Sequence, residues 1–386
     1  TRYDHHDHEQ RIYKMWEDSG AFNPDTNGKK DSKGKPFTII MPPPNANDPL
    51  HIGHAMFVTI EDMFIRFHRM LGDDTLWLPG TDHAGIETQY VFEKKLQKDG
   101  KSRFQFDRAT LYQMIWEYVQ ENSNVAVDQM KKLGASADWS RFTFTLDPEV
   151  VASVRESFYK LHKDGLIYRD LKLVNYCTKC GTSYSELEVV HTEQADPLYF
   201  MQYGELEVAT VRPETMFGDV ALAVHPSDER YTKYIGTTIS IPLPDPTLAP
   251  LQLKVYADEF VDPEFGTGVV KITPAHDAND FAVGKKYALP IVQVIDTRGK
   301  MMANTGRFAG MSVNDARREV VTALMEKGAL NNEKTNNKYL HNVGTCYRCG
   351  KIIEPLPLPQ FFLKVKSENK NLVSAVEKAL DTGETK

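Results

Sequence analysis

Two cysteine motifs that lie far apart in the sequence constrain the fold of this chain more than any other feature. The chain has four cysteines, which form the pairs Cys177-x-x-Cys180 and Cys346-x-x-Cys349. Four thiolates suit a closed, structural zinc site with no open position for catalysis. A redox-active pair or unrelated buried thiols are the alternatives. A shared zinc would join the two motifs, so we expect the residues between them to form a domain inserted into a parent fold.

The composition excludes several classes of protein. Hydrophobic residues make up 41% and charged residues 26% of the 386 residues, which indicates folded domains rather than a disordered chain. No apolar run approaches the roughly 20 residues needed to cross a bilayer, so we expect no membrane protein. The net charge of −7 argues against a protein that coats nucleic acid, although it allows a local basic groove. The cysteine usage and the lack of a signal-peptide pattern favour a cytoplasmic location.

The character of the sequence changes along its length. Short β-rich runs separated by Pro and Gly fill the region between the cysteine pairs, whereas helical patterns dominate before it. The predicted fold class is α/β: the first half of a Rossmann-like parallel sheet, an inserted α+β domain of β-barrel-like form, and a zinc site with four cysteine ligands. We expect an N-terminal helix and loop (1–36), the half-sheet with helices (37–176), two zinc knuckles (177–190 and 341–356), the inserted domain (191–340) and the start of a return to the parent fold (357–386).

A strand–helix–strand unit near the N-terminus predicts the parallel sheet. Phe37–Met41 is a short apolar run typical of a buried strand, and Thr75–Leu78 is a second. Between them, hydrophobic residues recur at helical spacing as far as Leu71, and Gly72 ends the predicted helix. In open sheets of this kind, ligands bind at the carboxyl ends of the strands. The turns after these two strands are therefore the first places to look for a site.

The turn after the first strand carries two histidines with the right spacing for a phosphate site. His51 and His54 are three residues apart, so they share one face at a helix N-terminus, where the helix dipole favours anions. Their imidazoles could donate hydrogen bonds to phosphate oxygens, and Gly53 leaves room for a flat base. Asp82, in the turn after the second strand, could hold an ammonium group. The alternative for all these polar residues is ordinary helix capping.

Several strings of residues resemble one family of enzymes. PPPNANDPLHIGHA (residues 42–55) and LPGTDHAGIETQ (residues 78–89) resemble the class I aminoacyl-tRNA synthetases that carry the "HIGH" signature, and the second string resembles the valine-specific branch. The resemblance covers nearly the whole chain. It continues, in the same order, through Leu133–Trp139, Gly165–Arg169, Arg212–Thr215 and Lys271–Asp277.

The resemblance implies roles for the residues of the first two turns. His51 and His54 would stabilise charge on the ATP phosphates while the carboxylate of valine attacks the α-phosphorus. Asp82 would hold the α-amino group, and Pro42 and Asn45 would line the amino-acid and adenylate pocket. The implied substrates and partners are L-valine, tRNA(Val) and ATP with Mg²⁺, and the implied parent enzyme is a monomer.

The resemblance also implies a hydrolytic editing site in the inserted domain. Threonine and valine have almost the same shape, so a valine pocket cannot strongly reject threonine, a limit for which the valine enzyme is the usual example. Asp280 would bind the α-amino group of misattached L-threonine, and Asp277 would bind its hydroxyl. From the residues alone, this pair also fits an ordinary helix cap. The residues implied to hold the tRNA terminus and position water are Arg212, Thr215, Lys271 and Thr273.

Two departures from the family pattern affect the expected activity. Thr210-Val211 stands where the family usually has Thr-Thr, so editing could be weaker or arranged differently. No Lys-Met-Ser-Lys-Ser string occurs, so we expect part of a longer polypeptide that does not complete aminoacylation. The alternatives are a stand-alone deacylase of mischarged tRNA with a vestigial nucleotide-binding half, and a zinc-stabilised RNA-binding module without chemistry.

Overall fold

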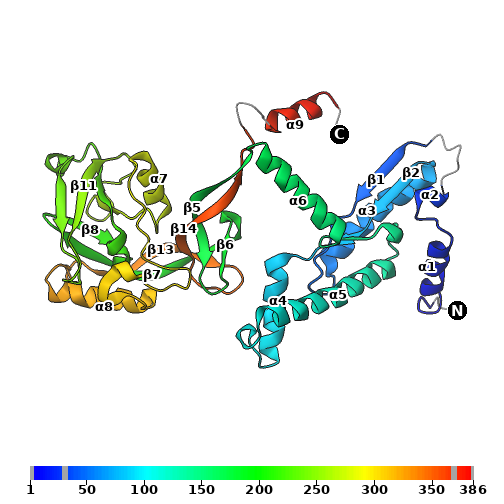
Figure 1. Cartoon of the computed structure of the whole chain (residues 1–386), viewed down its shortest axis with the longest axis horizontal. Coiled ribbons are helices and arrows are strands. Elements are labelled where there is room, and N and C mark those ends of the chain that lie inside the picture. Colours follow the sequence, from blue (N-terminus) through cyan, green and yellow to red (C-terminus); the bar gives the residue numbers. More distant parts are fainter. Residues whose placement is uncertain (1–3, 28–33, 367–371, 384–386) are drawn as a thin grey trace. The chain divides into compact units, whose positions relative to one another are not determined.

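The chain folds into two compact units, which are described separately. The computed structural model describes residues 4–27, 34–366 and 372–383, and the units are Thr1–Gly165 and Leu166–Lys386 (Figure 1). Parts of the expected N-terminal loop (28–33) and of the last predicted segment (367–371 and 384–386) lie outside the described residues. The finer division into six segments remains a prediction.

The first unit is built on the predicted parallel crossover. Strands β1 (Pro36–Ile40) and β2 (Asp74–Leu78) pair in parallel, and helix α3 (Ile52–Leu71) connects them and ends at Gly72. A second parallel pair joins β3 (Gly80–Thr81) to β4 (Thr143–Phe144). The remaining helices are α1 (Glu9–Asp18), α2 (Pro24–Asn27), α4 (Gly85–Lys98), α5 (Arg108–Lys132) and α6 (Pro148–Lys163).

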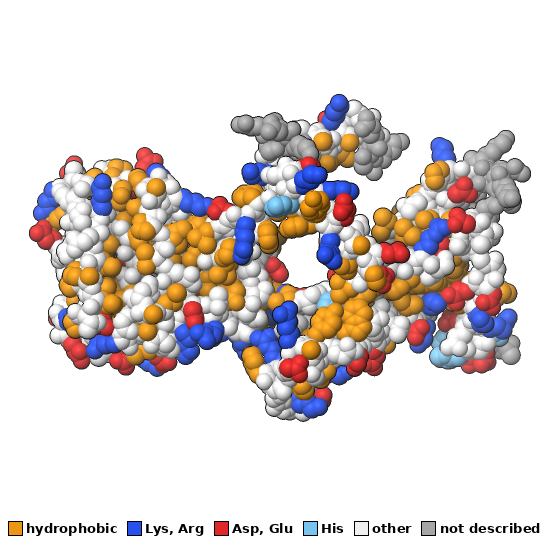
Figure 2. Space-filling model, in the orientation of Figure 1, with side chains coloured by type: hydrophobic (Ala, Val, Ile, Leu, Met, Phe, Trp, Pro, Cys, Tyr) orange, Lys and Arg blue, Asp and Glu red, His pale blue; other side chains and the backbone are white. Residues whose placement is uncertain are grey.

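The core of the first unit lies between α3, the strands and α5. Ile65 and Trp77 are fully buried there, and Met130 from α5 packs against them. Truncating a buried residue of this size to alanine typically costs about 2–5 kcal/mol, so this contact fixes α3 on the sheet. The opposite side of α3 exposes hydrophobic side chains, among them Met56 and Phe67. Hydrophobic side chains are visible at several places on the molecular face drawn in Figure 2. A helix that is apolar on both sides is suited to burial within a larger sheet structure.

The second unit contains three antiparallel or mixed sheets. One has the order β14-β5-β6, the next β13-β7-β8, and the third β10-β11-β9-β12. The bounds of these strands are β5 (Ile167–Cys177), β6 (Thr182–Tyr184), β7 (Val189–Tyr203), β8 (Leu206–Thr210), β9 (Ala221–Val224), β10 (Thr238–Ile241), β11 (Leu251–Ala257), β12 (Val269–Ile272), β13 (Asn336–Cys346) and β14 (Glu354–Leu363). Helices α7 (Ala278–Lys286), α8 (Val313–Glu326) and α9 (Leu372–Asp381) complete it.

The main core of the second unit lies between two of its strands and α8. Alternating residues of β7 and β8, such as Met201 and Val208, pack against Val320 and Leu324 of α8. A smaller core joins Ile272 of β12 to α7. The α+β character is therefore confirmed. The hydrogen-bonded ladders between the described strands do not close into a barrel, so the β-barrel-like part of the prediction is not confirmed.

Two further features of the fold concern strand β14 and the lengths of the helices. Strand β14 is the edge strand of its sheet, and it pairs with β5 over all ten of its residues although three of them are proline: Pro355, Pro357 and Pro359. In addition, among the described helices none combines the length and the apolar character required to pass through a bilayer.

Candidate functional site

The first candidate site starts at the N-terminus of α3. The Nδ1 atom of His51 accepts a hydrogen bond from the backbone amide of Gly53 (3.1 Å), and Nδ1 of His54 accepts one from the amide of His51 (3.2 Å). Both histidines therefore cap α3, as the alternative interpretation of this turn predicted. Because Nδ1 is an acceptor in both rings, each neutral imidazole carries its proton on Nε2, which remains a potential donor. Burial and the neighbouring His51 lower the pKa of His54.

Backbone hydrogen bonds tie the two predicted turns together. The amide of Ala46 donates to the carbonyl oxygen of Asp82 (2.7 Å), and the amide of Asp82 donates to the carbonyl oxygen of Pro44 (2.9 Å). Asn45 therefore pairs with Asp82 in an isolated parallel bridge. Pro42 lies exposed in the same turn. The structure thus brings Asn45 and Asp82 side by side. Asn45 lies six residues before His51 in the sequence.

A threonine that the sequence analysis did not single out fixes the carboxylate of this turn. The Thr145 hydroxyl donates to Oδ1 of Asp82 (2.8 Å) and accepts a hydrogen bond from the amide of His83 (3.0 Å). Thr145 directly follows β4, which pairs with β3, so the second parallel pair positions it. Its role depends on strand pairing between distant segments, and no local pattern reveals it. Asp82 is half-buried, so part of its surface is open to solvent.

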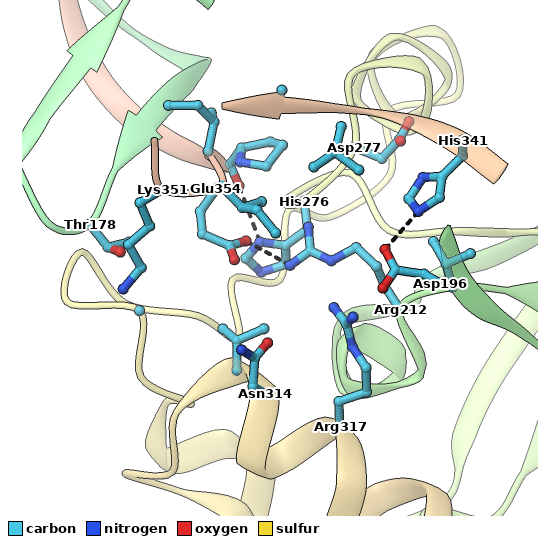
Figure 3. A pocket seen from close by; sticks show the side chains of 18 of the residues that line it. Thr178, Asp196, Arg212, His276, Asp277, Asn314, Arg317, His341, Lys351 and Glu354 are labelled. Carbon is cyan, nitrogen blue, oxygen red and sulfur yellow. Dashed lines mark hydrogen bonds and ion pairs between the residues drawn. The ribbon is translucent and has the colours of Figure 1, made fainter. Parts of the chain in front are cut away.

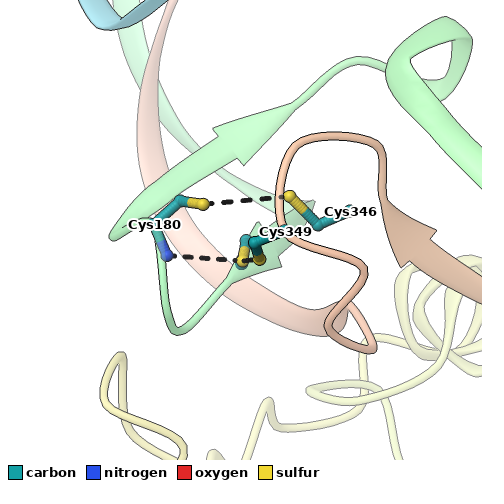
Figure 4. A group of neighbouring side chains, drawn as sticks. Cys180, Cys346 and Cys349 are labelled. Carbon is teal, nitrogen blue, oxygen red and sulfur yellow. Dashed lines mark hydrogen bonds between the residues drawn. The ribbon is translucent and has the colours of Figure 1, made fainter. Parts of the chain in front are cut away.

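The four predicted cysteines come together in the second unit. Their Sγ atoms all lie within 4.8 Å of one another (Figure 4). Cys177 Sγ is 3.5 Å from Cys349 Sγ, and Cys180 Sγ is 3.9 Å from Cys346 Sγ. Four thiolates about 2.3 Å from one tetrahedral zinc would be separated by about 3.8 Å, so both the donor set and the spacing fit zinc.

Two similar turns shape this cluster. In each, the amide of the glycine after the pair donates to the carbonyl oxygen of the first cysteine over 2.8 Å, from Gly181 to Cys177 and from Gly350 to Cys346. Both glycines have a positive φ, 71° and 68°, which a residue with a Cβ rarely adopts. The two Cys-x-x-Cys-Gly sequences, at residues 177–181 and 346–350, therefore share one backbone geometry.

A cavity of about 430 Å³ in the second unit contains two of the predicted editing residues. Arg212 and Asp277 line it, and Figure 3 shows Asn314 and Arg317, both from α8, extending toward the same space as Arg212. Asp277 caps α7, because its Oδ1 accepts hydrogen bonds from the amides of Asn279 (2.8 Å) and Asp280 (3.0 Å). The predicted cap is therefore present, and it leaves the second oxygen of an exposed carboxylate at the cavity.

Arg212 belongs to a network of buried ion pairs. Its guanidinium donates to Glu354 (2.6 Å) and to Glu214 (3.2 Å). Arg317 forms two further hydrogen bonds to the Glu214 carboxylate, of 2.9 and 2.8 Å. Although burial acts to raise it, the two guanidinium groups hold the pKa of Glu214 below its ordinary value. The charge of Arg212 is thus partly neutralised where it faces the cavity.

The other predicted editing residues form a buried polar cluster. The Lys271 ammonium donates to the hydroxyls of Thr215 (3.0 Å) and Thr273 (2.7 Å), and the amide of Thr273 donates to Oδ2 of Asp280 (2.7 Å). Burial, followed by the nearby carboxylate of Asp277, raises the pKa of Asp280 to about 7. The sequence reasoning missed Asp219, which lies at the centre of this cluster. An aspartate inside the apolar run Met216–Val224 was the available signal.

Comparison with known proteins decides the family. The family model described as tRNA synthetases class I (I, L, M and V) matches residues 11–384. The chain belongs to the class I tRNA synthetase family. The valine–tRNA ligase of Syntrophotalea carbinolica is 43% identical over an alignment of 390 positions, which covers 100% of this chain and 42% of that protein. The valine–tRNA ligase of Carboxydothermus hydrogenoformans is 44% identical over 93% of this chain and 40% of its own length.

The match has a defined extent. This class I synthetase chain spans about two fifths of the length of the curated relatives it matches. Among solved structures, the ternary complex of leucyl-tRNA synthetase, tRNA and LeuAMS from Agrobacterium radiobacter K84 aligns with a TM-score of 0.40 and 18% identity, over 92% of this chain and 49% of that one. In the class I synthetase chain described here, the "HIGH" turn, the Asp82 turn and the cysteine cluster all lie in the matched region.

Proposed function

We propose that this chain carries the amino-acid-activating turns and the editing domain of a cytoplasmic valine–tRNA ligase. The observation that carries the proposal is the hydrogen-bonded pairing of the turn around Asn45 with the turn around Asp82. This pairing puts the Asp82 carboxylate, which can bind an ammonium group, beside the turn that leads into α3. The N-terminus of α3 favours phosphate. The relatives at 41–44% identity are valine–tRNA ligases, which supports valine as the amino acid.

In the proposed activation step, the valine carboxylate attacks the α-phosphorus of ATP and pyrophosphate leaves. Asp82 holds the ammonium group of valine through the carboxylate oxygen that Thr145 leaves free. His51 and His54 offer their Nε2 protons to the phosphate oxygens on which charge develops, next to the N-terminal dipole of α3. Mg²⁺ enters as the partner of ATP. Gly53 fits the cap itself, because an added Cβ would lie 2.9 Å from the His51 ring.

In the proposed editing step, water adds to the carbonyl carbon of the threonyl ester and the bond to the terminal ribose of tRNA(Val) breaks. Asp280 binds the ammonium group of the misattached L-threonine, and Asp277 accepts a hydrogen bond from its side-chain hydroxyl. Arg212, Thr215, Lys271 and Thr273 are proposed to hold the tRNA terminus and orient water. A methyl group cannot replace the hydroxyl at the Asp277 acceptor without losing its hydrogen bond, which would protect Val-tRNA(Val).

The cysteine cluster is proposed to hold structural zinc. Cys177 ends β5 and Cys180 follows it, whereas Cys346 ends β13 and Cys349 follows it, so zinc would join the two chain segments that lead into and out of the inserted region. With four thiolate ligands, the ion supplies stability and no chemistry.

Deacylation of Thr-tRNA(Val) by this chain tests the editing proposal. We expect measurable hydrolysis of Thr-tRNA(Val), little of Val-tRNA(Val), and loss of at least about tenfold in rate for Asp280→Ala. Asp258→Ala is the matched control, because Asp258 is equally buried in the same unit but pairs with Lys286 away from the cavity. Equal rates for the wild type and Asp280→Ala would contradict the proposal.

Binding of a non-hydrolysable valyl-adenylate analogue distinguishes the main alternative. Calorimetry is expected to detect binding that Asp82→Asn abolishes. Deacylation without any analogue binding would instead favour a stand-alone deacylase whose nucleotide-binding half is vestigial.

A further inference from the structure

The ammonium group of Lys271 has a complete set of internal acceptors. It donates to Thr215 Oγ1 (3.0 Å), Thr273 Oγ1 (2.7 Å) and Asp219 Oδ1 (3.0 Å), and only 9% of the Lys271 side chain is exposed. A protonated lysine has three donors, so all of them are used inside the unit. In this arrangement Lys271 acts on a substrate mainly through its charge, and the charge is balanced by Asp219.

Asp219 is the residue that holds this cluster together. Its Oδ1 accepts hydrogen bonds from Lys271 and from the Thr273 hydroxyl (2.5 Å), and its Oδ2 accepts one from the hydroxyl of the fully buried Tyr203 (2.7 Å). The carboxylate has no exposed surface. A buried charge is stable only when it is paired and hydrogen-bonded, and here two different strands, β7 and β12, supply the partners.

Thr273 connects Asp219 to the carboxylate proposed for editing. Its side chain contacts Asp219, while its backbone amide donates to Oδ2 of Asp280 over 2.7 Å. Three charged groups act on Asp280: Asp277 from the cap of α7, Lys271 from β12, and Asp219 from the segment after Gly218. A displacement of Asp219 would therefore move Thr273, which is hydrogen-bonded to Asp280, and would also change the effect of the Lys271 charge on Asp280.

We propose that Asp219 is a positioning residue, which fixes the Lys271 ammonium, whose charge acts on Asp280, and holds Thr273 where its backbone amide donates to the Asp280 carboxylate at the editing site. The catalytic part of this inference rests on the proposed editing function. The positional part concerns only the contacts among Asp219, Lys271, Thr273 and Asp280, and it can be tested without catalysis. The competing interpretation is that Asp219 and Lys271 form a purely structural ion pair.

Titration of the Asp280 carboxyl carbon by NMR tests the positional part. Asp219→Asn removes one negative charge near Asp280 and leaves the Lys271 ammonium unbalanced, so the Asp280 carboxylate is favoured. We expect its titration midpoint to fall by about one pH unit. Asp258→Asn, which removes the charge of a different buried Asp–Lys pair, is expected to leave the midpoint unchanged. A purely structural pair would lower the melting temperature of Asp219→Asn without moving the Asp280 midpoint, and that result would overturn the proposal.

Deacylation kinetics test the catalytic part. We expect Asp219→Asn to slow hydrolysis of Thr-tRNA(Val) at least about tenfold. If that variant does not fold, Tyr203→Phe serves instead, because it keeps the charge and removes only the hydrogen bond to Oδ2; we expect about threefold slower hydrolysis. An unchanged rate in a folded variant would refute the catalytic part. If the wild-type chain itself does not hydrolyse Thr-tRNA(Val), the proposed function fails, whereas the NMR titration still decides the positional part.

Discussion

The imidazole of His276 accepts a hydrogen bond on Nε2 from the backbone amide of Val294, over 3.0 Å. Its Nδ1 therefore carries the proton of the neutral ring and donates to the carbonyl oxygen of Pro355, over 3.2 Å. The ring is 4% exposed and links the segment before α7 to strand β14. Burial, together with the positive charge of Arg212, lowers the pKa of His276 to about 3.

The first prediction is that acid destabilises the second unit through His276. Because the folded-state pKa lies below the unfolded value of about 6.5, the stabilisation is complete above pH 6.5 and is lost as the pH falls toward 3. The loss approaches about 1.4 kcal/mol per pH unit in this window. His276→Gln should remove this dependence, and the exposed His191→Gln should retain it. Urea unfolding followed by far-UV circular dichroism at several pH values measures both, and identical slopes for His276→Gln and the wild type would contradict the assignment.

The second prediction concerns zinc. We expect one zinc per chain by elemental analysis, and a lower melting temperature of the second unit after chelation or in Cys349→Ser. The four tryptophans, Trp16, Trp77, Trp116 and Trp139, all belong to the first unit. Tryptophan fluorescence should therefore report an unchanged transition while circular dichroism reports the loss. A chelated chain that melts like the untreated one would argue against a structural metal.

The third prediction concerns the threonine behind Asp82. Thr145→Ala should weaken binding of the valyl-adenylate analogue about fivefold, because one hydrogen bond to the Asp82 carboxylate is lost. Thr145→Ser should restore most of the affinity, since it keeps the hydroxyl. Thr143→Ala is the control, because the Thr143 hydroxyl donates to the carbonyl oxygen of Arg141 instead of to Asp82. Calorimetry measures the affinity of each variant for the analogue. Equal affinity for Thr145→Ala and the wild type would show that Thr145 does not contribute to binding.

The fourth prediction concerns the buried carboxylate between two arginines. Glu214→Gln leaves the guanidinium groups of Arg212 and Arg317 without their shared counter-charge, and breaking a buried pair costs about 3–5 kcal/mol. The second unit should unfold at a markedly lower urea concentration. Glu319→Gln, at an exposed position of the same helix as Arg317, should change the midpoint little. Similar midpoints for the two variants would show that the network contributes little.

The fifth prediction is a pH dependence of editing. Asp280 binds an ammonium group only as a carboxylate, and its pKa is raised to about 7. The rate of Thr-tRNA(Val) hydrolysis, corrected for the uncatalysed reaction, should therefore rise between about pH 6 and pH 8 and then level off. The same raised pKa means that the contribution of Asp280 to stability is present below its unfolded pKa and is lost as the pH rises through about 7. A corrected rate that is flat from pH 6 to pH 8 would exclude this role for the Asp280 carboxylate.

Local patterns predicted the parts of the fold that depend on neighbours in sequence. The run Phe37–Met41 and the helix that stops at Gly72 appeared nearly as expected, and the rule for strand ends brought the turns of Asn45 and Asp82 together. The cysteine spacing was sufficient to predict a shared cluster. In contrast, the local pattern did not predict strand β9. Its four residues are all buried, so it shows no alternation of apolar and polar side chains, and the sequence around it is apolar as well.

Partners that meet only after folding were not predictable in the same way. Arg212 finds Glu354 at a separation of 142 residues, and Thr145 reaches Asp82 at a separation of 63. Nothing in the local sequence specifies such pairs, because they depend on how strands of different sheets are placed. Asp219 belongs to the same class, since its role follows from Tyr203 at the end of β7 and Thr273 directly after β12.

The prolines of β14 have a consequence for how this chain associates with others. Residues two apart in a strand direct their backbone nitrogens to the same edge, so Pro355, Pro357 and Pro359 withhold three donors from a single side. Since β14 pairs with β5 along its whole length, that side is the one facing away from β5. An incoming strand would find carbonyl acceptors there without matching amides. The edge of β14 that faces away from β5 therefore disfavours pairing with a further strand. This holds even during synthesis, when the hydrophobic residues around it are not yet buried.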